Sequence, residues 1–138
     1  MFAKGKRGVI FLREYEREKI AVKSKNPKST TPGRIDIEAN FLQKLNKVKI
    51  GPKFKFFEEG ELGMEFIDGE LFEEYIQKNC KKNIIKVVME LFKQLHTMDK
   101  LGINKEEMHH PFKHIIVRNN MPVMIDFERC RYTKKVQN

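Results

Sequence analysis

The sequence predicts an α+β protein in which a mostly antiparallel sheet with one helix precedes a helical segment and a final hairpin. Two runs rich in β-branched and aromatic residues, 9–15 and 19–25, flank a short charged stretch, as the two strands of a hairpin do. A later segment, 84–98, carries apolar residues three and four positions apart, which is the spacing of an amphipathic helix. The chain contains no internal repeat, so these elements occur once each.

The composition is that of a folded, basic protein of 138 residues, enough for one compact domain or two small lobes. With 40% hydrophobic residues the chain can bury a core. Its net charge of +9 fits a nucleic-acid face, a pocket for a phosphorylated molecule, or solvated surface lysines. No apolar run approaches the roughly 20 residues of a membrane helix, and no secretion signal is evident, so we expect a cytoplasmic protein. Cys80 and Cys130 indicate neither a disulfide framework nor a zinc site.

The first half of the chain contains the predicted sheet and its helix. Turn-forming residues fill 26–33, and 34–47 then shows apolar residues at helical spacing. Two further strands, 54–57 and 62–67, are separated by an acidic turn. With the first hairpin, these strands complete the antiparallel sheet of a predicted N-terminal lobe, residues 1–67.

The second half is predicted to be helical and to end in a small hairpin. Its pattern changes to helix from the boundary onward, which places a second lobe at 68–138. Asn83 is the expected cap of the long helix, and Gly102 is expected to end it in a left-handed turn. Two short apolar runs, 115–117 and 123–125, flank a polar turn and predict the hairpin.

Glu38 and Lys23 are the first candidate functional pair. A helix that buries its apolar residues brings the Glu38 carboxylate to the edge of its buried face. A partly buried carboxylate needs a cation, and Lys23 is the best candidate because it lies in a strand on the side opposite Ile20 and Val22. The alternative is that both residues are ordinary surface charges.

Three further features carry candidate binding groups. Gly5 and Gly8 precede the first strand at a spacing that lets backbone N–H groups approach phosphate oxygens. Asp126 directly follows a strand, where a carboxylate can hold a divalent metal, although a strand-end Asp is more often a turn residue. Three of the four histidines lie within 109–114, but no further ligand at a recognisable spacing indicates zinc.

The order and spacing of these features resemble the protein-kinase-like superfamily. The segment 3–10 is similar to the phosphate-covering loop, with Ala3 at the first glycine position. Lys23 matches the strand lysine that orients the α- and β-phosphates, and Glu38 matches its helix partner. Asp126-Phe127-Glu128 stands where the metal-binding Asp-Phe-Gly motif belongs, with Glu128 replacing glycine.

The resemblance extends over nearly the whole chain, from Ala3 to about Lys135. The segment 64–69 resembles the hinge. It implies that backbone groups of Glu65 and Ile67 bind adenine and that Met64 is the gatekeeper. Within the superfamily, 50–52 and 107–117 look closest to small archaeal predicted Ser/Thr protein kinases, which are distant relatives of RIO-type kinases. The implied fold is a two-lobe one, with a truncated helical C-terminal lobe.

Two departures from the family pattern concern the catalytic loop and the chain length. His109 stands at the position of the catalytic Asp, and a neutral imidazole can replace it as proton acceptor. His114 stands at the position of the metal-binding Asn, which favours a softer ion such as Mn²⁺ over Mg²⁺. The chain ends 138 − 126 = 12 residues after Asp126, so the resemblance implies either a minimal core or a shortened version of a longer kinase.

These observations predict an ATP-binding, kinase-like protein that transfers the γ-phosphate with Mg²⁺ or Mn²⁺, formally a Ser/Thr protein kinase. A pseudokinase that binds nucleotide or a partner without turnover is the second interpretation, because His109 and the short C-terminal lobe depart from the pattern. A small basic RNA-binding protein is the third, although no RNA-binding motif is present. One side of the helix 84–98 is expected to be under-covered, which favours self-association or a protein partner.

Overall fold

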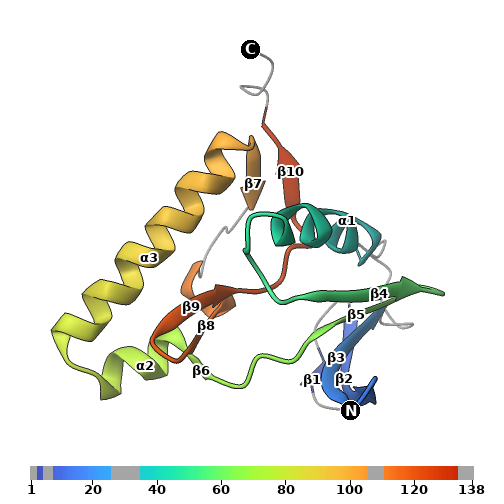
Figure 1. The fold of residues 1–138 in the computed structure, drawn as a ribbon, viewed down its shortest axis with the longest axis horizontal. Helices are drawn as coiled ribbons and strands as arrows, with labels where there is room; N and C mark the ends of the chain where they lie inside the picture. Colours follow the sequence, from blue (N-terminus) through green and yellow to red (C-terminus); the bar gives the residue numbers. More distant parts are fainter. Residues whose placement is uncertain (1–2, 5–7, 26–34, 106–110, 134–138) are drawn as a thin grey trace.

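The protein has an α+β structure, described by a computed structural model for residues 3–4, 8–25, 35–105 and 111–133 (Figure 1). This part contains three α-helices and antiparallel sheets of five, three and two strands, so the predicted class is confirmed. In chain order the elements are β1 (Ala3–Lys4), β2 (Gly8–Tyr15), β3 (Glu18–Lys25), α1 (Ile35–Asn46), β4 (Phe54–Glu58), β5 (Glu61–Glu65), β6 (Glu70–Leu71), α2 (Phe72–Lys78), α3 (Lys81–Lys100), β7 (Ile103–Lys105), the 3-10 turn η1 (Pro111–His114), β8 (Ile115–Arg118), β9 (Met121–Met124) and β10 (Cys130–Tyr132).

The five-stranded sheet forms from the predicted strands, in the order β1-β2-β3-β5-β4. β2 and β3 form the predicted first hairpin, and α1 packs against β3, β4 and β5. Gly63 in β5 lies beneath the Phe56 ring of β4, where an added Cβ would be 2.3 Å from a ring carbon. A larger residue at this position would therefore displace the Phe56 ring.

A single buried cluster joins this sheet and α1 to the second half of the chain. It includes Leu42 and Leu45 of α1, Leu91 of α3 and Val117 of β8. Phe127, which follows β9, is fully buried in the same cluster. Burial of apolar area is the main favourable term in folding, so this cluster fixes the sheet relative to the hairpin β8–β9.

The hairpin β8–β9 lies between the five-stranded sheet and the helices α2 and α3 (Figure 1). It confirms the predicted second hairpin, and β6 adds a third strand through the pair Leu71 and Ile116. The sequence analysis missed the pairing of β7 with β10, which joins Ile103 to Tyr132. Each of these strands has three residues, too few to show an alternating pattern.

Helix α3 begins earlier than predicted. Cys80 is its N-cap, and the Cys80 carbonyl accepts a hydrogen bond from the Ile84 N–H at 3.1 Å. The expected cap Asn83 is therefore wrong, because the helix already begins at Lys81. The predicted end is confirmed, since Gly102 follows the helix with a φ of +71°, in the left-handed region that glycine adopts without strain.

The exposed apolar face of α3 is not the one expected from the sequence, because Leu91 and Met98 of the predicted apolar side are buried. Val87 and Leu91 lie in the core, whereas Ile85, Met89 and Phe92 are 49%, 58% and 62% exposed. These three residues lie at i, i+4 and i+7 and so share one side of the helix. The predicted association with a partner or a second copy stays a prediction. Among the described helices, none combines the length and apolar character needed to cross a membrane.

Candidate functional site

The strand β3 presents Lys23 toward α1 because side chains alternate along a strand. Ile20 and Val22 pack with Phe56 in a separate buried cluster on the outer face of the sheet. Ala21 and Lys23 therefore point to the other face, against which α1 packs. This places the ammonium group beneath the helix that carries Glu38.

Lys23 and Glu38 form a buried ion pair, which confirms the predicted pairing of these two residues. The Lys23 Nζ lies 2.8 Å from Glu38 Oε1, and Glu38 is 1% exposed. The second carboxylate oxygen, Oε2, accepts a hydrogen bond from the Phe127 backbone N–H at 3.0 Å. Both oxygens of the buried carboxylate thus have donors, which offsets the cost of removing its charge from water.

Asp126 completes a triangle of charges with this pair. Its Oδ1 lies 3.4 Å from Lys23 Nζ, and its Oδ2 lies 3.1 Å from His114 Nε2. Asp126 has a φ of +68°, a conformation that Asp tolerates better than most residues. Lys23 and Asp126 are 103 positions apart in sequence, so only the fold brings them together.

The pKa values at this site are set by burial and by the opposite charges. Burial lowers the pKa of Lys23, but the carboxylates of Glu38 and Asp126 raise it more, so the net shift is upward and Lys23 is charged. Burial raises the pKa of Asp126, but its interactions with Lys23, His114 and Lys105 outweigh burial and lower the pKa below its ordinary value of 3.8. The Lys23 ammonium and the Asp126 carboxylate are therefore both charged at neutral pH.

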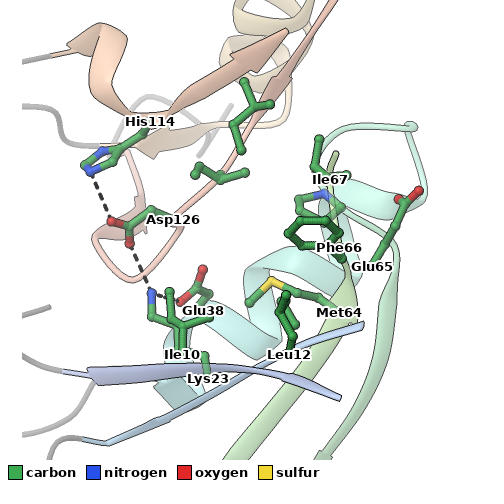
Figure 2. A pocket seen from close by; sticks show the side chains of 14 residues that line it. Ile10, Leu12, Lys23, Glu38, Met64, Glu65, Phe66, Ile67, His114 and Asp126 are labelled. Carbon is green, nitrogen blue, oxygen red and sulfur yellow. Dashed lines mark hydrogen bonds and ion pairs between the residues drawn. The ribbon is translucent and has the colours of Figure 1, made fainter. Parts of the chain in front are cut away.

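A pocket of about 190 Å³ opens beside these charges (Figure 2). Its walls are apolar: side chains of β2 and β3 line one side, and side chains of the hairpin β8–β9 and its exit line the other. The apolar wall residues are Ile10, Leu12, Ala21, Ile116 and Ile125. Lys23, Asp126 and His114 lie together toward one end of the pocket, and Met64, Phe66 and Ile67 lie toward the other. Such an apolar pocket with charged groups at one end accommodates an apolar group whose charged part reaches Lys23.

The segment from Met64 to Ile67 passes from the sheet to the hairpin at the other end of the pocket. Met64 lies opposite Ala21 in the pairing of β5 with β3, and this pairing ends at Glu65. The chain then leaves the sheet and reaches β6, where Gly69 lies against β8. An added Cβ on Gly69 would be 2.4 Å from the Val117 carbonyl oxygen, so this connection is closely packed.

The remaining predicted site residues differ in what the structure says of them. Gly8 begins β2 opposite Lys25, and Ile10, two residues later, lines the pocket. Gly5 and His109 lie outside the described residues. Among the described residues, no group of three or more His, Cys, Asp or Glu side chains is close enough to hold a metal by itself. Asp126 and His114 supply two candidate metal ligands.

Sequence reasoning missed the apolar walls of the pocket. The alternation of Ile10 and Leu12 along β2 was a usable signal, since both side chains face the same side of the strand. The positions of Ile116 and Ile125 had no such signal, because the hairpin that carries them is placed by long-range packing. The bond from the Phe127 N–H to Glu38 was also missed, because it joins residues 89 positions apart.

No protein-family model matches the chain. One similar protein is "Uncharacterized protein MJ1211" from Methanocaldococcus jannaschii, which is 33% identical over 75 residues. The matched stretch covers 54% of this chain and 64% of that protein, slightly less than two thirds of its length. These comparisons leave the activity to be argued from the site.

Proposed function

We propose that this chain is an ATP-binding protein of the protein-kinase-like superfamily, with a small two-lobe fold, that transfers the γ-phosphate of ATP with Mg²⁺ or Mn²⁺. The observation that carries the proposal is the triangle of Lys23, Glu38 and Asp126 at one end of an apolar slot. A buried ammonium held by one carboxylate and facing a second suits phosphate oxygens and a metal ion together. The acceptor proposed is a Ser or Thr hydroxyl.

The apolar slot is suited to the adenine ring. Ala21 of β3 and Ile116 of β8 both line the pocket, and Met64 lies toward the end away from Asp126 (Figure 2). Beyond Glu65 the chain is no longer paired in the sheet, so we propose that backbone groups of Glu65 and Ile67 bind the adenine edge. In this arrangement the phosphates lie toward Lys23, near the start of β2 at Gly8.

The residues Asp126 and His114 fit a divalent ion. Their facing atoms, Oδ2 and Nε2, are 3.1 Å apart, and with Nε2 unprotonated they would hold a divalent ion through one oxygen and one nitrogen. Such an ion would supply positive charge to neutralise the phosphates. Lys23 holds the phosphates through its ammonium group, and Glu38, fixed by the Phe127 N–H, keeps that group oriented. Asp126 remains ionised because its pKa is lowered. His109 stays the proposed proton acceptor.

The test is a thermal-melt series with ATP and either Mg²⁺ or Mn²⁺, followed by transfer of labelled γ-phosphate. Nucleotide at about 100 times its Kd stabilises a folded protein by about 2.7 kcal/mol, a shift of several degrees. Asp126→Asn and Lys23→Met should abolish the shift. Lys55→Met is the matched control, since Lys55 forms an ion pair with Glu18 at the same 2.8 Å but away from the pocket. A wild type whose melting temperature is unmoved by ATP with either metal contradicts the proposal.

A pseudokinase is the second candidate, favoured by His109 at the position of the catalytic Asp. It predicts the metal-dependent shift in melting temperature without phosphate transfer, and His109→Asp would then be expected to introduce turnover. RNA binding that falls steeply with salt and is unaffected by Lys23→Met would instead favour the third interpretation of the sequence.

A further inference from the structure

Arg118 lies on the same face of β8 as two residues of the pocket. Side chains alternate along a strand, so positions 114, 116 and 118 face the same way. The hydrogen bond from the Ile125 N–H to the His114 carbonyl extends the strand pairing to His114. His114 and Ile116 line the pocket, and Arg118 continues this row toward the connection that begins at Glu65.

Arg118 binds the side chain of Glu65. Its Nη1 donates to Glu65 Oε2 at 3.0 Å, and the Lys53 backbone N–H donates to the other oxygen, Oε1, at 3.1 Å. The Glu65 N–H in turn donates to the Lys53 carbonyl at 2.8 Å. One carboxylate thus joins the start of β4, the end of β5 and the end of β8. Figure 2 shows Glu65 far from Lys23 and Asp126, at the other end of the pocket.

Glu65 and Arg118 both line a hollow that side chains do not fill. This space of about 470 Å³ is lined by Lys49, Gly51 and Lys53 on one side and by Met121 and Pro122 of the hairpin on the other. Among the described residues that line it, Glu65 is the sole acid. Arg118 therefore has one acidic partner in this hollow, and that partner belongs to the sheet that forms the opposite wall of the pocket.

We propose that Glu65 and Arg118 are positioning residues that set the distance between the two walls of the nucleotide pocket at its adenine end. This inference rests on the proposed function. The pair touches neither the phosphate end nor the metal ligands, so its loss should weaken adenosine and ATP binding by the same factor. Breaking it lowers the fraction of molecules in the binding-competent arrangement, and each Kd rises by the inverse of that fraction.

The experiment measures Kd for adenosine and for ATP with Mn²⁺ in Arg118→Met, Glu65→Gln and the double variant. We expect each variant to raise both Kd values about fivefold, and the double variant to be no worse than either single one. Arg118→Lys, which keeps the charge but loses the planar fork, should recover part of the affinity. Arg13→Met, which breaks the exposed pair with Glu61, is the control.

Hydrogen exchange without nucleotide gives a second readout. Amides 66–69 should exchange faster in Arg118→Met, while the midpoint of urea unfolding changes little. Equal Kd values in Arg118→Met and wild type overturn the inference, as does a loss confined to ATP. If wild type binds neither adenosine nor ATP, the proposed function fails, and unchanged exchange at 66–69 would then also reject the positioning pair.

Discussion

The two ends of the pocket are built from different kinds of charge pairs. At the Lys23 end, Lys23 and Glu38 are almost completely buried, so each charge is stabilised by the other and not by water. At the Glu65 end, the side chains of Glu65 and Arg118 are 17% and 36% exposed, so water also stabilises their charges. When a buried pair loses one member, neither a partner nor water stabilises the remaining charge. When a part-exposed pair loses one member, water stabilises the charge that remains. The pair of Lys23 and Glu38 should therefore govern stability and binding together, and the pair of Glu65 and Arg118 binding alone.

The largest expected effect separates these two ends by stability. Lys23→Met leaves the Glu38 carboxylate buried without its cation, and we expect a loss of about 3–5 kcal/mol in the free energy of unfolding. The double variant Lys23→Met, Glu38→Leu should regain most of that loss, because no charge is then buried. Urea unfolding measures both values. If the single variant were as stable as the double one, water would stabilise the remaining Glu38 charge, and the two charge pairs would not differ in burial as described.

A second, smaller effect tests how closely the connection from β5 to β6 packs against β8. Gly69→Ala brings a Cβ to within 2.4 Å of the Val117 carbonyl oxygen, a rigid neighbour, and should cost about 2–3 kcal/mol. Gly60→Ala is the matched control, because a Cβ there has no neighbour within 4 Å and pays only for a φ of +75°, about 1 kcal/mol. Chemical unfolding compares the two. If Gly69→Ala were the milder change, the connection between sheet and hairpin would be looser than described.

The same contrast explains what the sequence could and could not predict. Lys23 and Glu38 were found because strand alternation and helix spacing are local patterns, and each placed its residue on a definite face. The pair of Glu65 and Arg118 was missed, although both residues lie in segments whose structure was predicted. They are 53 positions apart, and only the placement of the hairpin against the sheet brings them together. That placement depends on packing of the shared core, which periodicity within one segment does not encode.

Acid titration gives the smallest effect and distinguishes Asp126 from the buried pair. The pKa of Asp126 is lowered in the folded protein, because Lys23, His114 and Lys105 outweigh the effect of burial. A lowered folded pKa contributes stability that is present above the unfolded pKa, near 3.8, and is lost as the pH falls through the folded value. Wild type should therefore lose stability below about pH 5 more steeply than Asp126→Asn does.

Urea unfolding from pH 7 to pH 2 measures this difference, with the exposed Asp99→Asn as control. Parallel stability curves for wild type and Asp126→Asn would mean that the charges of Lys23, His114 and Lys105 do not reach Asp126 in solution. The charge network would then consist of Lys23 and Glu38 alone, and water would stabilise the Asp126 carboxylate as it does Glu65 and Arg118. Divergence of the curves only on the acid side places Asp126 within the charge network that we propose binds phosphate and metal.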